Sequence, residues 1–241
     1  MSYKNIPIEK ILFLDIETIP CESGYEQLDE DMRTLWDKKS AQFRMPDQSG
    51  ADVYERAGIY AEFGRIICIS VGFITVNAEG VKSFFSKSFA SDDERELLIG
   101  FCELVNKSYS TPDRYICGHN IKEFDMPFIA RRILINGLPL PSILDIAGKK
   151  PWEVSFLDTL ELWKFGDYKN YTSLNLLTHI FGIPTPKDDI DGSQVASVYY
   201  ETHDVKRISV YCEKDILATA QVFLRFRGES LIPPENVTHR D

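Results

Sequence analysis

Runs of hydrophobic residues predict five strands in this chain. Residues 11–17 read ILFLDIE, four apolar positions followed by charge, which is typical of a buried strand whose far end reaches a polar edge. The long apolar run 64–76 and the run 80–89 are separated by a short polar segment, so we expect them to form a hairpin. Shorter runs over 114–120 and 153–158 indicate two further strands.

Helical patterns alternate with these strands. Ser91 is a suitable helix N-cap, and Glu94 three residues later completes a capping pattern, which predicts a helix to about residue 106. Residues 124–137 have a proline in the first turn and a glycine at the end, as a helix often does, and residues 159–228 are mostly helical in pattern. This order of elements predicts an α/β fold with a mixed five-stranded sheet flanked by helices.

The length and composition of the chain predict one domain over residues 1–241. Residues 20–60 differ from their surroundings, with Gly, Pro, Asp and Gln scattered among short helical patterns, and we expect an insertion or lid there with a helix near 25–43. Residues 229–241, rich in proline and polar side chains, are expected to form a loose tail.

Composition favours a soluble protein of a reducing compartment. Hydrophobic residues make up 44% of the chain and charged residues 27%, and no apolar run is long enough to span a bilayer. The five cysteines are single and widely spaced, which argues against a disulfide framework or a zinc motif. A cytoplasmic location without membrane attachment is the expectation.

Two carboxylates lie where the first strand ends. Asp15 and Glu17 are two residues apart, so their side chains point to the same face of the strand. The carboxyl ends of strands are where α/β sheets place their ligands, and two like charges on one face repel unless a cation lies between them. The alternative is that both residues mark a solvated strand end.

A third carboxylate, Asp125, lies at the predicted start of helix 124–137. An Asp just before a helix, with proline two residues on, is a good N-cap, which is one interpretation. The other is that the helix start presents the carboxylate to a cleft beside a strand end. Local pattern does not separate the two.

Tyr211 and Asp215 are four residues apart and project from one face of a predicted helix. Asp215 falls on the apolar side of the helical projection, where a carboxylate is costly unless it is paired or binds a metal. A buried Asp–Arg pair is the alternative to a metal site. The opposite, polar side is the one expected to face solvent, and it carries Lys206, Glu213, Lys214 and Gln221.

Three segments, DIET (15–18), NIKEFD (120–125) and YCEKD (211–215), together resemble the exonuclease motifs of the DnaQ-like DEDD superfamily. The YxxxD form of the third segment resembles the DEDDy branch, because the DEDDh branch has His at the position of Val210. The chain is similar to stand-alone predicted exonucleases related to the proofreading domain of family-B DNA polymerases. The resemblance extends from residue 11 to about residue 226 and implies an RNase H-like fold.

The resemblance implies a 3′→5′ exonuclease acting on the 3′ end of single-stranded DNA. The implied ligands of two Mg²⁺ or Mn²⁺ ions are Asp15, Glu17, Asp125 and Asp215, an all-oxygen set that suits hard cations. Tyr211 is implied to orient the attacking water, since a phenol with a pKa near ~10 is a poor base at neutral pH.

The same resemblance implies which residues bind the substrate. Thr18 and Asn120 are expected near the terminal nucleotide, and Phe124 is expected to stack on a base. Phe124 packed in the core is the alternative. Asp158 is expected to cap a helix.

Two other functions stay open at this point. One is a DEDDy ribonuclease similar to the RNase D group, although no appended helical RNA-binding domain is visible. The other is a non-catalytic nucleic-acid-binding module, which the four intact acids disfavour.

The charge balance predicts weak substrate binding. The chain has 27 basic and 37 acidic residues, a formal net charge of −10, whereas broad nucleic-acid binding usually accompanies a basic balance. A local positive groove is compatible with an acidic protein. The basic residues expected nearest the cleft would make only a few phosphate contacts, and they are Lys122, Arg131, Arg132 and Lys164.

Overall fold

A six-stranded mixed sheet forms the centre of the computed structural model, which describes residues 3–167, 171–184 and 190–240. Its strand order is β5-β4-β1-β2-β3-β6. The strands are β1 (Ile11–Pro20), β2 (Gly64–Val76), β3 (Lys82–Ala90), β4 (Tyr115–Gly118), β5 (Phe156–Asp158) and β6 (Val237–Arg240). Strand β2 is antiparallel to β1 and β3, while the other neighbours pair in parallel. The predicted mixed α/β fold is confirmed, but the sheet has six strands and not the predicted five.

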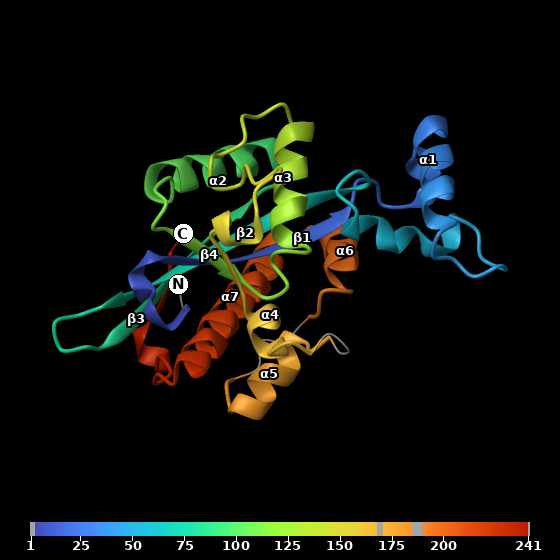
Figure 1. Ribbon diagram of the computed structural model, residues 1–241. Helices are drawn as coiled ribbons and strands as arrows, with labels where there is room; N and C mark the ends of the chain where they lie inside the picture. Colours follow the sequence, from blue (N-terminus) through green and yellow to red (C-terminus); the bar gives the residue numbers. More distant parts are fainter. Residues whose placement is uncertain (1–2, 168–170, 185–189, 241) are drawn as a thin grey trace.

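Helices cover both faces of the sheet (Figure 1). On one face lie α2 (Glu94–Ser108) and α3 (Asp125–Ile135), and on the other lies the long α7 (Val205–Arg227). The remaining helices are α1 (Glu30–Ser40), α4 (Thr159–Lys164), α5 (Leu174–Phe181) and α6 (Val195–Ser197). Short 3-10 segments are Tyr3–Asn5, Ile8–Lys10, Tyr25–Gln27, Ala51–Ile59, Pro151–Glu153 and Pro234–Asn236, and Val198–Thr202 is a π-helical turn. Within the described residues, no helix is both long and apolar enough to cross a membrane.

Alternation along β1 assigns its side chains to the two layers. Leu12 and Leu14 belong to the core that contains α2 and α3, whereas Ile11 and Phe13 belong to the core built on α7. The Phe13 ring meets that of Phe223 edge-on at 5.9 Å between centroids. Because the period of a strand is two, the residues that follow on the α7 side at the end of β1 are the two predicted carboxylates.

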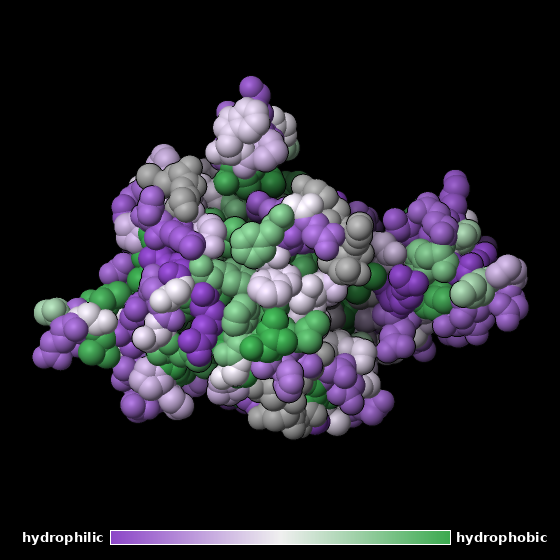
Figure 2. Space-filling view, turned by 60° about the horizontal axis from the view of Figure 1, so that its bottom comes forward, coloured by the Kyte–Doolittle hydropathy of each residue, from purple (hydrophilic) through white to green (hydrophobic). Residues whose placement is uncertain are grey.

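The insertion between β1 and β2 forms a small lobe with its own core, standing apart from the body of the molecule (Figures 1 and 2). Trp36 is fully buried in it and donates its indole N–H to the Gly50 carbonyl at 2.8 Å. Helix α1 is shorter than the expected 25–43, because Asp29 accepts a hydrogen bond from Met32 and so fixes the helix start.

The C-terminal residues differ from the expected loose tail. Strand β6 pairs with β3, and Gln221 of α7 exchanges two hydrogen bonds with the backbone of Ile232. Glu213, also on α7, pairs with His239 at 2.6 Å. The face of α7 expected to meet solvent is therefore partly covered, and Glu213 and Gln221 are only 8% and 5% exposed. This contact depends on the free edge of β3, which no local pattern reveals.

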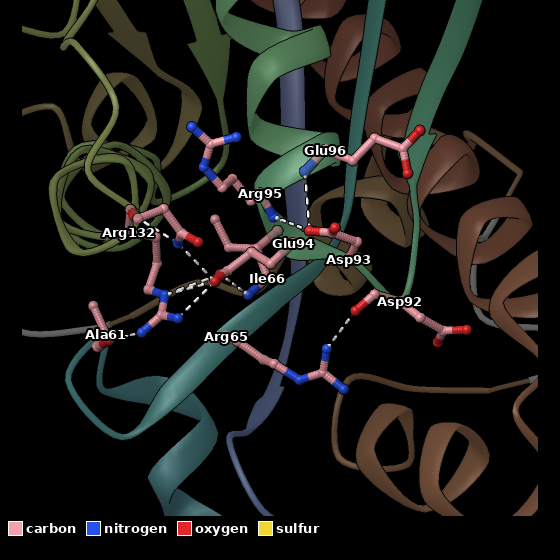
Figure 3. Close-up of polar contacts among 10 residues, drawn as sticks. Ala61, Arg65, Ile66, Asp92, Asp93, Glu94, Arg95, Glu96 and Arg132 are labelled. Atoms are coloured by element: carbon pink, nitrogen blue, oxygen red, sulfur yellow. Dashed lines mark hydrogen bonds and ion pairs between the residues drawn. The ribbon is translucent and has the colours of Figure 1, made fainter.

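A buried ion pair joins α2 to α3 (Figure 3). Arg132 is 8% exposed, and its Nη2 lies 2.6 Å from Oε2 of Glu94. Glu94 also accepts the Ile66 N–H at 2.7 Å, which ties the pair to β2. The expectation that Arg132 lines a substrate groove is wrong.

The expected capping pattern of Ser91 and Glu94 is also wrong, because Asp93 caps α2 and Glu94 is used for the ion pair.

Candidate active site

Side chains from β1 and α7 meet at the carboxyl end of β1. Asp15 and Glu17 point toward α7, whose Cys212 Sγ lies 3.5 Å from Oδ2 of Asp15. One ligand atom each of Asp15, Glu17 and Cys212 lies within 4.8 Å of the others. Tyr211 and Asp215, on the same stretch of α7, interact electrostatically with both β1 carboxylates. The four-residue spacing on α7 and the two-residue spacing on β1 thus bring these groups together.

Asp125 enters the site from the other layer of helices. Helix α3 begins at Asp125, with Phe124 at the N-cap position and no side-chain cap. Oδ1 of Asp125 instead accepts a hydrogen bond from the Ile16 N–H at 3.2 Å. The interpretation of Asp125 as an N-cap is therefore wrong, because its carboxylate is bound to the backbone between the two acids of β1.

Burial and mutual repulsion raise the pKa of the carboxylates. Glu17 and Asp125 are 7% and 3% exposed. Desolvation and then the charges of Asp125 and Asp215 hold the pKa of Asp15 well above its ordinary value. Desolvation, followed by the charges of Asp15 and Asp215, does the same for the pKa of Glu17. Desolvation also raises the pKa of Asp125 to about 7.

The carboxylate cluster has the chemistry of a divalent-cation site. Within the described part of the chain, neither Asp15, Glu17 nor Asp125 forms a salt bridge with a basic side chain. Glu17 is buried, and its carboxylate lies in one group with that of Asp15 and the Cys212 thiol. A buried carboxylate without a basic partner is costly, and a cation bound by several oxygens removes that cost. The residues therefore fit Mg²⁺ or Mn²⁺.

Tyr211 is held as a neutral phenol beside the acids. Its side chain is buried, and desolvation raises its pKa, with further increases from the charges of Asp215, Glu17 and Asp15 and from a hydrogen bond with Asp215. A phenol with a raised pKa donates its proton to a hydrogen bond and does not act as a base near neutral pH.

Asp158 holds the turn that leads to Asp125. As expected it caps a helix, accepting the Leu160 N–H at 2.9 Å at the start of α4. The same carboxylate also accepts the N–H groups of Asn120 and Lys122 at 3.0 and 3.2 Å. Asn120 has a left-handed backbone with φ 63°, so this tight turn is fixed from the next strand over. Sequence patterns gave no sign of this second role.

A pocket of about 470 Å³ adjoins Glu17 and contains two of the three residues expected to bind substrate. Thr18 and Phe124 line it, and the insertion supplies Arg56 and Ile59 as another wall. Phe124 is half-buried against the core and its ring lies 5.6 Å from that of Phe128, so both interpretations of this residue apply in part. Asn120, the third residue, is not part of the pocket lining.

Two functional candidates lie outside the predicted site residues, and one expected basic residue is used elsewhere in the fold. Cys212 follows Tyr211 in the third segment and lies on the same helix, but the spacing of the cysteines indicates no role for it. Arg56 lies in the insertion, where no motif marks it. Lys122, expected near the cleft, pairs with Glu161 at 2.6 Å, and Arg132 is buried with Glu94.

Residues 59–230, more than half of the chain, match a family described as "Predicted 3'-5' exonuclease related to the exonuclease domain of PolB". The chain belongs to this family. Membership confirms the expected relation to the exonuclease domain of family-B DNA polymerases and places the chain among predicted 3′-5′ exonucleases. No curated protein sequence matches the chain.

One solved structure resembles this chain in fold, and a second matches it more weakly. The family B DNA polymerase from the hyperthermophilic archaeon Pyrobaculum calidifontis matches with a TM-score of 0.53 and 16% identity, over 89% of this chain and 24% of the polymerase. E. coli Exonuclease I in complex with a dT13 oligonucleotide matches with a TM-score of 0.41 and 14% identity, over 90% of this chain and 41% of that one. The chain thus spans about a quarter to two fifths of the length of these structures.

Proposed function

We propose that this protein is a divalent-metal-dependent 3′→5′ exonuclease that removes nucleotides from the 3′ end of single-stranded DNA. The observation that carries the proposal is the group of carboxylates around the end of β1, with Asp15 and Glu17 on the strand and Asp125 bound to the Ile16 N–H between them. Asp215 adds a fourth carboxylate from α7.

The proposed metal ligands are Asp15, Glu17, Asp125 and Asp215. Two bound Mg²⁺ or Mn²⁺ ions would supply an acidified water and neutralise charge on the scissile phosphate. The protein supplies the positions of these ligands: Asp15 and Glu17 through strand alternation, Asp125 through its bond to Ile16, and Asp215 through the helical spacing from Tyr211. A site so built recognises a phosphodiester by its charge and geometry, not by its base.

Tyr211 is the proposed positioning group for the attacking water. Its burial and the nearby charges of Asp215, Glu17 and Asp15 raise its pKa, which keeps the hydroxyl proton in place. The hydroxyl can therefore hold a water by hydrogen bonding without removing a proton from it.

The pocket beside Glu17 is the proposed site of the terminal nucleotide. Its volume of about 470 Å³ lies within the ~300–1,000 Å³ common for small-molecule sites. Phe124 offers a ring face to a base, and Thr18 offers a hydroxyl to the sugar or phosphate. A nucleotide paired within a duplex would first have to unstack to enter, which favours single-stranded ends. DNA is proposed in preference to RNA because the family is related to the exonuclease domain of PolB.

Matched DNA and RNA oligomers test the proposal. Single strands of equal length and sequence, labelled at the 5′ end, are incubated with Mn²⁺ and excess protein. Stepwise shortening from the 3′ end, faster for DNA, is the expected result. Faster shortening of RNA would replace the proposed substrate with the RNase D-like alternative. Loss of the 5′ label as the first product would contradict the polarity.

A further inference from the structure

A thiol lies inside the carboxylate cluster. Cys212 is fully buried, and its Sγ is 3.5 Å from both Oδ2 and the backbone carbonyl oxygen of Asp15. With Glu17, it completes the three-residue group whose ligand atoms are mutually within 4.8 Å. The proposed function makes no use of this sulfur, because Mg²⁺ and Mn²⁺ prefer oxygen ligands.

We propose that Asp15, Glu17 and Cys212 form a binding site for a thiophilic divalent cation, Zn²⁺ in particular, and that Zn²⁺ bound there blocks nuclease activity. The first part rests on the geometry of these three side chains alone. The second part rests on the proposed function as well, since it concerns the metals that this function requires.

The spacing of the donor atoms suits a tetrahedral ion. A thiolate sulfur about 2.3 Å and a carboxylate oxygen about 2.0 Å from one tetrahedral Zn²⁺ are separated by about 3.5 Å. The distance from Cys212 Sγ to Asp15 Oδ2 is 3.5 Å. Glu17, a residue only 7% exposed, provides a second oxygen within 4.8 Å of the other two ligand atoms. Three protein ligands leave the fourth position of the ion open to water or to a phosphate oxygen.

The donor set favours Zn²⁺ over the ions of the proposed reaction. Affinity for nitrogen, oxygen and sulfur sites rises from Mn²⁺ to Zn²⁺, and sulfur ligands select for Zn²⁺. Mg²⁺ requires octahedral oxygen coordination, which a site with a sulfur at one corner does not offer. Binding deprotonates the Cys212 thiol, and the proton passes to solvent.

The two metal arrangements share Asp15 and Glu17 and so exclude each other. A Zn²⁺ ion drawn toward Cys212 uses both β1 carboxylates, leaving Asp125 and Asp215 without the partners needed to hold a pair of Mg²⁺ or Mn²⁺ ions. Zn²⁺ is therefore expected to act as a reversible inhibitor that competes with Mn²⁺ and whose potency depends on a sulfur ligand.

Cobalt substitution tests the site without using activity. The metal-free protein is titrated with Co²⁺ alone, and the thiolate-to-Co²⁺ charge-transfer absorption is recorded, followed by its loss as Zn²⁺ displaces Co²⁺. The band is expected in the wild type and in Cys21→Ser, which removes the most exposed of the cysteines. It is expected to be absent in Cys212→Ser, with Zn²⁺ affinity at least about tenfold lower, because loss of even an outer-shell partner costs about 10- to 100-fold.

Equal bands in the wild type and in Cys212→Ser would overturn the proposal, as would a band that Cys21→Ser removes. If Cys212→Ser does not fold, the ¹¹³Cd NMR shift of the Cd²⁺-loaded wild type decides: a shift typical of sulfur ligation supports the site, and one typical of oxygen ligands alone overturns it.

Inhibition of nuclease activity by Zn²⁺ tests the inhibitory role separately from the metal site and from the proposed function. Zn²⁺ is titrated at fixed Mn²⁺, and each variant is compared with its own activity in Mn²⁺ alone. Half-inhibition is expected to need at least about tenfold more Zn²⁺ in Cys212→Ser than in Cys21→Ser. Equal Zn²⁺ sensitivity contradicts the inhibitory role. A wild type with the Co²⁺ band but no nuclease activity would contradict the proposed function and leave the metal site standing.

Discussion

The backbone N–H of Ile16 donates a hydrogen bond to Oδ1 of Asp125 at 3.2 Å, across a separation of 109 residues. Ile16 lies between Asp15 and Glu17 in the strand. The bond therefore holds the Asp125 carboxylate next to the carboxylates of these two residues. It also fixes the start of α3 against the end of β1. The site thus depends on the packing of two layers of the fold and not on a single loop.

Asp158 is expected to matter for catalysis through the turn that it holds. Asp158→Ala leaves the N–H groups of Asn120, Lys122 and Leu160 without their acceptor. The free energy of unfolding should fall by about 1–3 kcal/mol, and turnover should fall because the turn precedes Asp125. Both are measurable by denaturant titration and by initial rates at saturating substrate.

Asp93→Ala is the matched control for Asp158→Ala, since Asp93 caps α2 by the same kind of bond and is not part of the site. It should lower the free energy of unfolding by about 1 kcal/mol and leave turnover unchanged. Equal turnover in the two variants would remove the positioning role of Asp158.

Tyr211→Phe removes one hydroxyl and keeps the buried ring. Turnover should fall by about 10²- to 10⁴-fold, the usual range for a positioned hydrogen-bonding group, while KM changes little because the metals and the pocket are intact. Single-turnover rates measure the chemical step directly. A single-turnover rate equal to that of the wild type would show that the hydroxyl does not hold the water.

The metal-free protein should lose stability as pH rises. Burial raises the pKa of Asp125 from 3.8 to about 7, so the folded state holds a proton that the unfolded state releases. Between about pH 4 and pH 7 the folded state therefore binds more protons, and the free energy of unfolding falls as pH increases. Burial raises the pKa of Asp15 and Glu17 as well, which adds in the same direction.

Thermal melts in EDTA across this range measure the effect, and Asp125→Asn should flatten the slope. Mn²⁺ added near pH 8 should restore the lost stability, because a ligand that binds only the folded state stabilises it. A melting temperature in EDTA that rises from pH 4 to pH 7 would contradict the raised pKa values.

The enzyme should act distributively and bind its substrate weakly. Of the basic residues expected near the cleft, Lys122 is paired with Glu161 and Arg132 is buried with Glu94. Few phosphates can then be neutralised, so the logarithm of affinity should fall only gently with the logarithm of salt concentration. With excess substrate, all strands should shorten together, and blunt duplexes should be cut slowly. Strands digested to completion beside untouched neighbours would indicate a larger binding surface.

The local part of the site could be predicted from the sequence. The apolar run before Asp15 gave the strand, the period of two placed Asp15 and Glu17 on one face, and the helical period placed Tyr211 with Asp215. Strand β2 has the predicted bounds, Gly64–Val76, because a long apolar run bounded by glycine and polar residues leaves little choice.

Contacts between distant segments could not be predicted in this way. Strand β6 needs the edge of β3, Arg132 needs Glu94 from another helix, and Asp125 needs the end of β1. In each case the local pattern predicts a simpler role: a tail, an arginine near the cleft and a helix cap. The same holds for Cys212, because a single thiol gains a role only from the carboxylates that folding brings beside it.

The most direct measurement follows a 5′-labelled single-stranded DNA with Mn²⁺ and either the wild type or Asp15→Asn, purified identically. The proposed function predicts a ladder of products shortened one nucleotide at a time from the 3′ end by the wild type. It predicts a rate lower by more than about 100-fold in Asp15→Asn, and no digestion in EDTA. Equal digestion by both proteins, or a ladder that persists in EDTA, would show that the carboxylate cluster at the end of β1 is not the catalytic centre.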